Sequence, residues 1–218
     1  MTHRQVPQIS SRKQPKQARS TELVATILEA AIQVLANEGA TRFTTARVAE
    51  RAGVSVGSVY QYFPNKAAIL FRLQSDEWQR TTQMLCGTLN DESKPPLERL
   101  RTFVHAFIHS ECEEAQMRIA LSDAAPLYRN APQAHEVRAA GEQIFKSFML
   151  ELLPEVQEAT RAVACDLIST TFSSVGKDFS GSPRTAAQIT AYADAMTDMF
   201  SAYVGVLEVT HASAPLPI

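Results

Sequence analysis

Apolar residues recur at intervals of three and four positions along most of this chain, which is the spacing of one face of an α-helix. The first such segment begins at Thr21, and the residues Asn37–Gly39 supply its stop signal, with Gly39 as the expected left-handed cap. Strand-like alternation flanked by hairpin signals does not occur in the sequence. The pattern therefore predicts an all-α protein.

The stretch from Thr44 to Lys66 predicts two short helices joined by a tight turn. Its inward-facing positions are apolar or aromatic: Val48, Ala52, Val54, Val59 and Tyr62. Gly53 can adopt the left-handed backbone of a sharp turn, and the Ser55 hydroxyl can accept a hydrogen bond from a backbone N–H at the start of the second helix. This combination predicts a helix-turn-helix.

Further helical patterns follow. Pro64 can start a long helix that is capped near Asn65 or Phe63 and runs to about Thr88. We expect further helices over residues 96–112, 114–121, 132–153, 154–179 and 184–210. The predicted organisation is a disordered basic arm (1–19), a three-helix DNA-binding head (20–66, with the motif at 44–63), a larger helical body (67–210), and a tail (211–218).

Charge divides the chain more sharply than its net charge of −2 suggests. Residues 1–80 hold 11 Lys and Arg against 6 Asp and Glu, a net of +5, and the remaining residues hold 10 against 17, a net of −7. A basic first third indicates that a polyanion binds at one end only. The arm carries Arg4, Arg12, Lys13, Lys16 and Arg19 and no acid, so it either lies along DNA phosphates or is a solubilising tail.

Several classes of protein are disfavoured by what the sequence lacks. No apolar run approaches the roughly 20 residues that span a bilayer, and no signal peptide is present, so we expect a cytoplasmic protein without a membrane partner. Cys86, Cys112 and Cys165 are odd in number and widely spaced, which favours free thiols over a disulfide framework. The phosphate-binding, dinucleotide-binding, hydrolase and zinc-protease motifs are missing, so we expect neither an enzyme nor a cofactor.

A resemblance to a known family rests on ILEAA (27–31), Gly39, FTTARVAERAGVSVGSVYQYF (43–63) and Lys66. Over residues 20–70 the chain resembles the DNA-binding head of the tetracycline-repressor (TetR) family of bacterial transcription regulators. The resemblance implies a homodimer that binds a double-stranded DNA operator and represses transcription until a small-molecule inducer binds the body.

The predicted DNA contacts all lie on or beside the two short helices. They are Thr44, Thr45, Arg47, Ser55, Val56, Gly57, Ser58, Tyr60, Gln61, Tyr62 and Lys66. Helix starts and hydroxyls suit phosphate, Val56 suits a thymine methyl group, and Gln61 suits a base edge. In the family, the positions that match Tyr60, Tyr62 and Lys66 commonly contact the phosphate backbone. Core packing is the alternative for Tyr62.

One departure from the family concerns Val56, where many relatives carry a lysine. The second helix of the motif therefore has no Lys or Arg between Ser55 and Tyr62. Arg47, Lys66 and the basic arm must supply more of the affinity. We expect deletion of residues 1–19 to weaken operator binding and to flatten its dependence on salt.

The last two predicted helices carry small residues at near-helical spacing together with bulky apolar ones. The predicted dimer interface comprises Ala159, Val163, Leu167, Tyr192, Met196, Met199 and Tyr203. Two copies of this helix pair would form a four-helix interface that sets two heads about 34–36 Å apart. The alternative is that these helices bury each other within one chain.

The body also holds aromatic and methionine side chains that can line an apolar ligand pocket. The candidates are Phe103, Phe107, Met117, Tyr128, Phe145, Phe148, Met149 and Phe172, with plain core packing as the alternative. His105, His109 and Cys112 share one helical face, but one helix rarely completes a metal site, so we expect no metal.

The first interpretation is a repressor released from its operator by a small hydrophobic ligand. The second is a DNA-binding regulator without such an inducer, controlled by a partner protein or acting as an activator. A tightly filled body would favour the second interpretation. An enzyme with an accessory DNA-binding head is disfavoured by the missing catalytic motifs.

Overall fold

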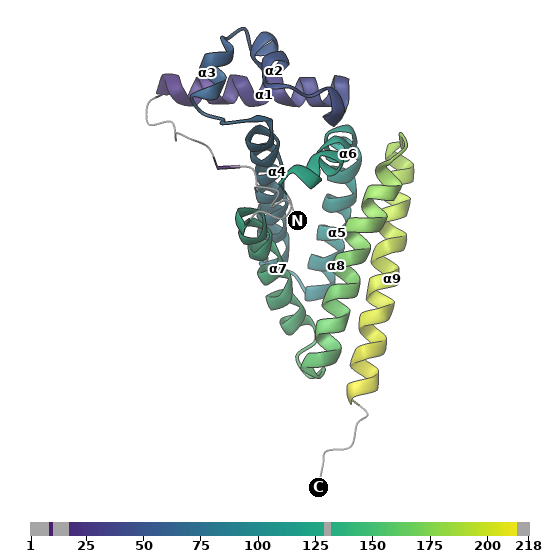
Figure 1. Ribbon diagram of the computed structural model, residues 1–218. Helices are drawn as coiled ribbons and strands as arrows, with labels where there is room; N and C mark the ends of the chain where they lie inside the picture. The colour runs from purple at the N-terminus through teal and green to yellow at the C-terminus, as the bar shows by residue number, and fades with distance from the viewer. Residues whose placement is uncertain (1–8, 11–17, 129–131, 213–218) are drawn as a thin grey trace, which may run out of the picture. The chain divides into compact units, whose positions relative to one another are not determined.

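The computed structural model describes residues 9–10, 18–128 and 132–212, and within these ranges it contains helices and no strand. The helices are α1 (Ala18–Arg42), α2 (Thr45–Ala52), α3 (Val56–Tyr60), α4 (Lys66–Leu89), α5 (Pro96–Glu113), α6 (Ala115–Ala124), the 3-10 turn η1 (Ala125–Leu127), α7 (Pro132–Leu152), α8 (Glu158–Ser180) and α9 (Ala186–Ala212) (Figure 1). The predicted all-α class is confirmed.

Two compact units divide these helices. The first contains α1 to α3, α4 as far as Gln79, α6, η1 and the start of α7, and the second contains the remainder. Helix α4 therefore belongs to both units, and so does α7. The predicted division at residue 67 stays a prediction.

Helix α1 differs from its prediction at Gly39. Its backbone there has φ 72° and ψ 172°, which is an extended conformation that essentially only glycine adopts, rather than the predicted left-handed cap. The chain resumes helical geometry beyond this kink and ends α1 at Arg42. The helix is therefore interrupted at Gly39, where the sequence predicts a stop, and a short helical segment follows the kink.

The core of the first unit explains why α1 is strongly apolar. Ile27, Ala31 and Leu35 are fully buried in the same cluster as Phe43 from the following turn. An 18-residue window of α1 has a mean hydropathy of 1.3, so α1 has the length and composition of a membrane-spanning helix. The sequence pattern predicts no apolar run of that length. A core helix passes the same test, and this burial accounts for its apolar residues.

Ile9 adds an unexpected member to that core. It is only 3% exposed and belongs to the cluster of the first unit. The sequence pattern instead predicts a disordered arm at this position. The charged arm residues Arg4, Arg12, Lys13 and Lys16 lie outside the described residues.

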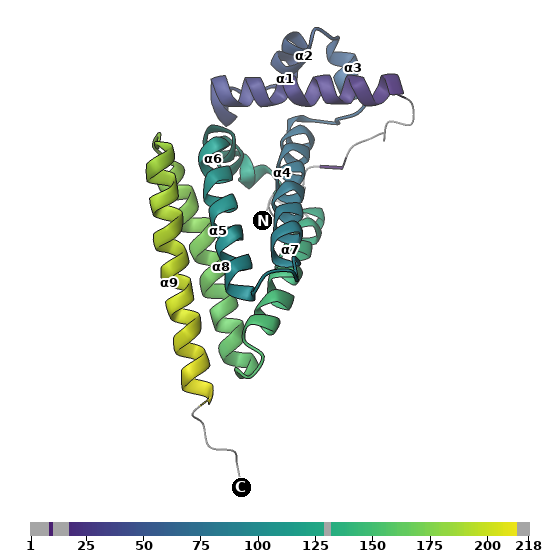
Figure 2. The ribbon, with the colours of Figure 1, turned by 180° about the vertical axis from the view of Figure 1, so that it is seen from behind.

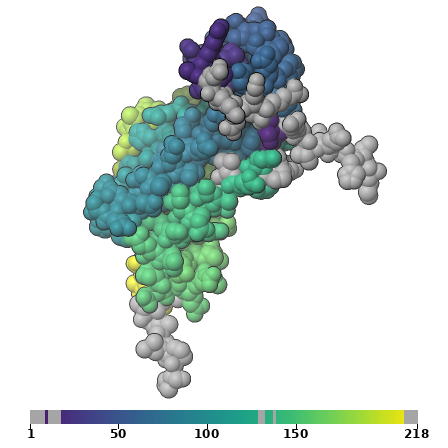
Figure 3. Space-filling view, turned by 90° about the vertical axis from the view of Figure 1, so that its left-hand side faces the viewer, coloured from purple at the N-terminus to yellow at the C-terminus, as the bar shows by residue number. Residues whose placement is uncertain are grey.

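The core of the second unit is built around phenylalanine rings from α5, α8 and α9. The Phe172 ring lies 5.1 Å from Phe103, 5.2 Å from Phe107 and 5.0 Å from Phe200. Helices α8 and α9 run side by side in both ribbon views (Figure 2). Helix α4 packs closely against α7, since a Cβ added at Gly141 would lie 3.2 Å from Thr82 Oγ1. Both helices reach the molecular surface that Figure 3 shows.

Candidate nucleic-acid interface

Helix α2 begins and ends with the groups that the sequence indicates. The Thr44 hydroxyl accepts a hydrogen bond from the Arg47 backbone N–H at 3.3 Å. At the other end Gly53 has φ 67° and ψ 28°, the left-handed conformation, and the Val54 N–H bonds to the Ala49 carbonyl at 3.0 Å. The predicted turn geometry is therefore confirmed. Figure 1 shows α2 and α3 on the same side of α1.

Helix α3 is short, and its N-terminus is capped by a serine. Ser55 accepts a hydrogen bond from the Ser58 backbone N–H at 3.0 Å, and the two hydroxyl oxygens lie 2.8 Å apart. Val59 is fully buried and anchors the helix, whereas Val56 and Tyr60 are 40% and 42% exposed. The outer face of α3 thus presents a valine and a tyrosine one turn apart.

The predicted contact residues differ in how much surface they offer. Thr45 and Tyr62 are each only 7% exposed, so Tyr62 adopts the core-packing alternative. Lys66 is half-buried at the start of α4, where the Asn65 side chain accepts a hydrogen bond from the Ala68 N–H at 2.9 Å. The exposed or half-buried members of the predicted set are Thr44, Arg47, Ser55, Val56, Gly57, Ser58, Tyr60, Gln61 and Lys66.

Both arginines of α2 are joined to α1, which the sequence pattern does not indicate. Arg47 forms an ion pair with Glu38, and Arg51 Nε donates to Gln33 Oε1 at 2.6 Å. The partners are 9 and 18 residues apart in sequence, and no short motif signals such pairs. The Arg47 guanidinium is therefore already paired within the protein.

Family models match both parts of the chain. The model for bacterial regulatory proteins of the tetR family matches residues 27–73, and that for the tetracyclin repressor-like C-terminal domain matches residues 95–207. The chain belongs to the TetR family. Members of this family are non-enzymatic DNA-binding transcriptional regulators and are typically dimers. The prediction of a DNA-binding regulator is therefore confirmed for this TetR-family chain.

Curated relatives match only part of this TetR-family chain. The nucleoid occlusion factor SlmA of Vibrio campbellii is 32% identical over 120 residues, which are 54% of this chain and 60% of SlmA. The transcriptional repressor KstR of Rhodococcus jostii is 28% identical over 145 residues, 65% of this chain and 66% of KstR. The chain thus spans about three fifths of the length of the SlmA relative it matches.

Solved structures support the fold over most of the chain. The fatty acid degradation regulator FadR of Bacillus halodurans has a TM-score of 0.67 at 19% identity, covering 86% of this chain and 96% of that one. NalD, the secondary repressor of a multidrug efflux pump in Pseudomonas aeruginosa, has a TM-score of 0.62 at 19% identity, covering 84% and 96%. At this identity the likeness concerns the fold alone.

The predicted dimer residues fall into two groups. Val163 and Leu167 on α8 and Met199 on α9 are 63%, 50% and 50% exposed, and Ala159 is exposed as well. Met196 is 5% exposed within the core of its own unit, which contradicts its placement in a dimer interface. Tyr192 and Tyr203 are half-buried, and the Tyr192 ring stacks on Phe179 at 3.8 Å.

The predicted pocket residues are divided between the two cores. Met117 and Tyr128 pack in the first unit, and the phenylalanines Phe103, Phe107, Phe145, Phe148 and Phe172 pack in the second. Of the eight, Met149 alone borders the groove of about 780 Å³ that lies between α7 and α8. The shared apolar pocket wall stays a prediction.

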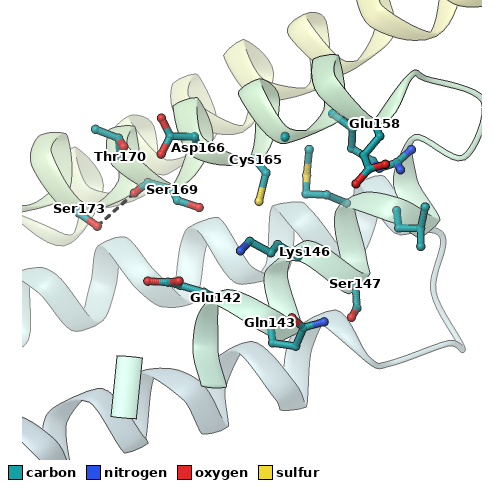
Figure 4. Close-up of a pocket in the computed structure, with 14 residues that line it drawn as sticks. Glu142, Gln143, Lys146, Ser147, Glu158, Cys165, Asp166, Ser169, Thr170 and Ser173 are labelled. Atoms are coloured by element: carbon teal, nitrogen blue, oxygen red, sulfur yellow. Dashed lines mark hydrogen bonds between the residues drawn. The ribbon is translucent and has the colours of Figure 1, made fainter. Parts of the chain in front are cut away.

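The groove between α7 and α8 is lined mostly by polar side chains. Its lining residues are Glu142, Gln143, Lys146, Ser147, Met149, Leu150, Glu158, Arg161, Ala162, Cys165, Asp166, Ser169, Thr170 and Ser173. Lys146 and Cys165 extend into it from opposite helices (Figure 4). Burial raises the pKa of the Cys165 thiol, although the Lys146 ammonium acts in the opposite direction, so the thiol is protonated at neutral pH.

His105 of α5 is paired with a carboxylate of α9. His105 Nε2 lies 3.1 Å from Asp194 Oδ1 of α9, and the same carboxylate forms an ion pair with Arg101. Among the described residues, no three His, Cys, Asp or Glu side chains gather in a way that would hold a metal. His105, His109 and Cys112 therefore do not form such a group.

Proposed function

We propose that this TetR-family chain is a cytoplasmic, homodimeric transcriptional repressor that leaves its operator when a small molecule binds its body. The observation that carries the proposal is the capped α2–α3 unit, whose outer side chains stay exposed on a chain matched by both TetR-family models. Thr44, Arg47, Ser58, Tyr60, Gln61 and Lys66 would contact DNA.

The groove between α7 and α8 is the proposed ligand site. Its volume of about 780 Å³ lies within the range of small-molecule sites, roughly 300–1,000 Å³. Polar groups such as Lys146, Asp166 and Ser169 border it next to Met149 and Leu150. We therefore expect an amphipathic ligand with polar groups in place of the purely hydrophobic one suggested by the sequence.

Release from DNA requires the ligand to prefer the conformation that does not bind the operator. Helix α4 belongs to both compact units, so a change in its position within one unit is transmitted along the chain to the other. The name of the relative KstR as a transcriptional repressor supports a repressor for this chain.

A direct test measures binding to the DNA upstream of the protein's own gene by fluorescence anisotropy, with and without a panel of amphipathic and lipophilic compounds. We expect binding without compound and release by at least one of them. Ser169→Phe, which fills the groove, should retain DNA binding and lose the release. Ser182→Phe, in the exposed turn before α9, should behave like the unaltered protein. Release that persists unchanged in Ser169→Phe would exclude the groove as the ligand site.

The alternative is a DNA-binding regulator controlled by a partner protein or acting as an activator. The closely packed phenylalanine cluster around Phe172 favours it, because a filled body leaves little space for a buried ligand. The match to nucleoid occlusion factors also supports it. Retention of DNA binding with every compound, together with release by a cell extract after removal of small molecules, would favour this alternative.

A further inference from the structure

The outer face of α3 is largely apolar. Val56 and Tyr60 are 40% and 42% exposed, and a Cβ at Gly57 would meet only Ser55 Oγ, at 3.7 Å. The hydroxyls of Ser55 and Ser58 share a hydrogen bond, which occupies part of their capacity to bind a base. A DNA duplex that approaches this face therefore meets a valine side chain with open space beside it.

The outer face of α3 lacks the basic side chains that usually recognise guanine. Guanine is most often read by an Arg or Lys that donates to its O6 and N7 atoms. Helix α3 contains no Arg or Lys, and the nearest arginines in sequence are held by α1, Arg47 through Glu38 and Arg51 through Gln33. These contacts reduce the availability of a guanidinium for base reading.

We infer that α3 recognises the C5-methyl group of thymine, so that A·T pairs form the part of each half-site beneath it. Val56 packs against that methyl group in the major groove, where thymine alone of the four bases carries one. Gln61, exposed at the end of α3, donates to and accepts from adenine. The inference rests on the DNA-binding part of the proposed function and not on ligand release.

The same chemistry predicts a response to DNA methylation. Cytosine methylated at C5 presents a methyl group at the same position of the major groove as thymine does. Burial of one methyl group corresponds to about a four-fold change in affinity. Removing a contacted thymine methyl should therefore weaken binding about four-fold, and 5-methylcytosine should restore part of the loss caused by replacing that thymine with cytosine.

The experiment starts with the full-length protein and a library of random duplexes, from which bound sequences are selected at low salt. In the selected duplex, each thymine of the half-site is replaced singly by deoxyuridine, which lacks only the methyl group. We expect at least one replacement in each half-site to weaken binding about four-fold. Replacement of thymines in the flanking sequence serves as the DNA control and should have no effect.

A double-mutant cycle assigns the contact to Val56. Val56→Ala should weaken binding to the thymine duplex but not add to the loss on the deoxyuridine duplex. Leu97→Ala alters a side chain of similar exposure, 41%, at the start of α5 and should leave both affinities unchanged.

The outcomes separate the two proposals. Failure to enrich any duplex would overturn DNA binding and with it the proposed repressor. Enrichment with affinities that are insensitive to deoxyuridine, or additive losses in the cycle, would overturn the methyl recognition alone. A half-site dominated by guanine, with binding abolished by Arg47→Ala, would also overturn it.

Discussion

Arg99 shows how a single charged residue can be internal and still have partners for both terminal nitrogens of its guanidinium. Its side chain is 2% exposed, Nη1 donates to the Leu89 carbonyl at 2.6 Å, and the guanidinium forms an ion pair with Glu151 of α7. The Phe148 ring lies 5.6 Å from the guanidinium carbon. Arg99 therefore ties the end of α4 to α5 and α7.

Arg99→Ala should lower the free energy of unfolding by about 2–4 kcal/mol, because it leaves the Leu89 carbonyl without its donor and opens a cavity. Arg99→Met keeps most of the volume and should cost about half as much. Glu151→Gln should cost less than about 1 kcal/mol, since Glu151 is half exposed. Urea unfolding at fixed protein concentration checks the order, and equal losses for all three would contradict this role.

Tyr128 is a second internal polar residue, and its stabilising effect depends on pH. Its hydroxyl donates to the Leu121 carbonyl at 3.0 Å or to Gln74 Oε1 at 3.1 Å. Burial, and then the Glu77 carboxylate, raises the pKa of Tyr128. The folded state therefore favours the protonated phenol, and this stabilisation is complete below a pH of about 10 and is lost as pH rises towards the folded-state pKa.

Tyr128→Phe should cost about 1 kcal/mol near neutral pH through the lost hydrogen bonding. It should also remove part of the loss of stability between pH 9 and 11. Urea midpoints measured across this range test both effects. Tyr60→Phe, which changes a tyrosine that is 42% exposed, is the control and should leave stability near neutral pH unchanged.

At the scale of elements, two glycines have a backbone conformation that favours glycine, and a third lies in ordinary helix. Gly53 closes α2 with φ 67°, Gly39 bends α1 with φ 72° and ψ 172°, and Gly87 lies within α4 with open space around its Cβ position. The first two conformations disfavour any side chain, whereas a helical backbone favours alanine over glycine.

Gly53→Ala should destabilise the protein by about 1–2 kcal/mol. Gly39→Ala should cost at least as much, because alanine is excluded more strongly from its region of φ and ψ. Gly87→Ala should instead stabilise by about 0.5–1 kcal/mol. Thermal unfolding of the three variants measures the signs. A loss of stability in Gly87→Ala comparable to that in Gly53→Ala would show that the backbone conformation is not the cause.

At the scale of the whole molecule, α8 and α9 expose several large apolar side chains. Val163, Leu167, Met199, Val206 and Val209 are all at least half exposed. Large apolar side chains gathered on one face are typical of an interface between copies. This arrangement supports the proposed homodimer.

Leu167→Glu combined with Met199→Glu should shift the protein from dimer to monomer at micromolar concentration and lower operator affinity, because two half-sites would no longer be held by one particle. Sedimentation equilibrium measures the mass. Glu155→Gln, outside this face, is the control. An unaltered protein that sediments as a monomer would contradict the dimer.

The basic arm belongs to the same scale, because we propose that it adds phosphate contacts to those of the α2–α3 unit. Deletion of residues 1–19 would also remove Ile9, which is buried in the core, so a reduced affinity would have two causes. A variant in which Arg4, Arg12, Lys13 and Lys16 are all changed to Gln avoids this problem.

In this variant, the slope of log affinity against log salt should flatten by up to about 0.9 for each DNA phosphate that the arm no longer neutralises. Thermal stability should be unchanged, because Ile9 is retained. Fluorescence anisotropy at several salt concentrations gives the slope. A slope equal to that of the unaltered protein would show that the arm does not bind phosphate.

The sequence by itself determined the helices, the α2–α3 motif and its caps, because helical periodicity and capping depend on residues only a few positions apart. Ser55, Gly53 and Asn65 act on neighbours within the same turn, so local rules were sufficient. Exposure of Val56 and Tyr60 followed from the same periodicity.

Only the tertiary structure decided which apolar side chains form core and which form surface. Met196 and Met199 are three residues apart on α9, yet they are 5% and 50% exposed, because packing on the phenylalanine cluster selects one side of the helix. The pairing of Arg47 with Glu38 and the groove between α7 and α8 likewise depend on how two successive helices pack, which the periodicity of either helix does not specify. Periodicity defines a face, but the neighbour that covers that face is a property of the folded chain.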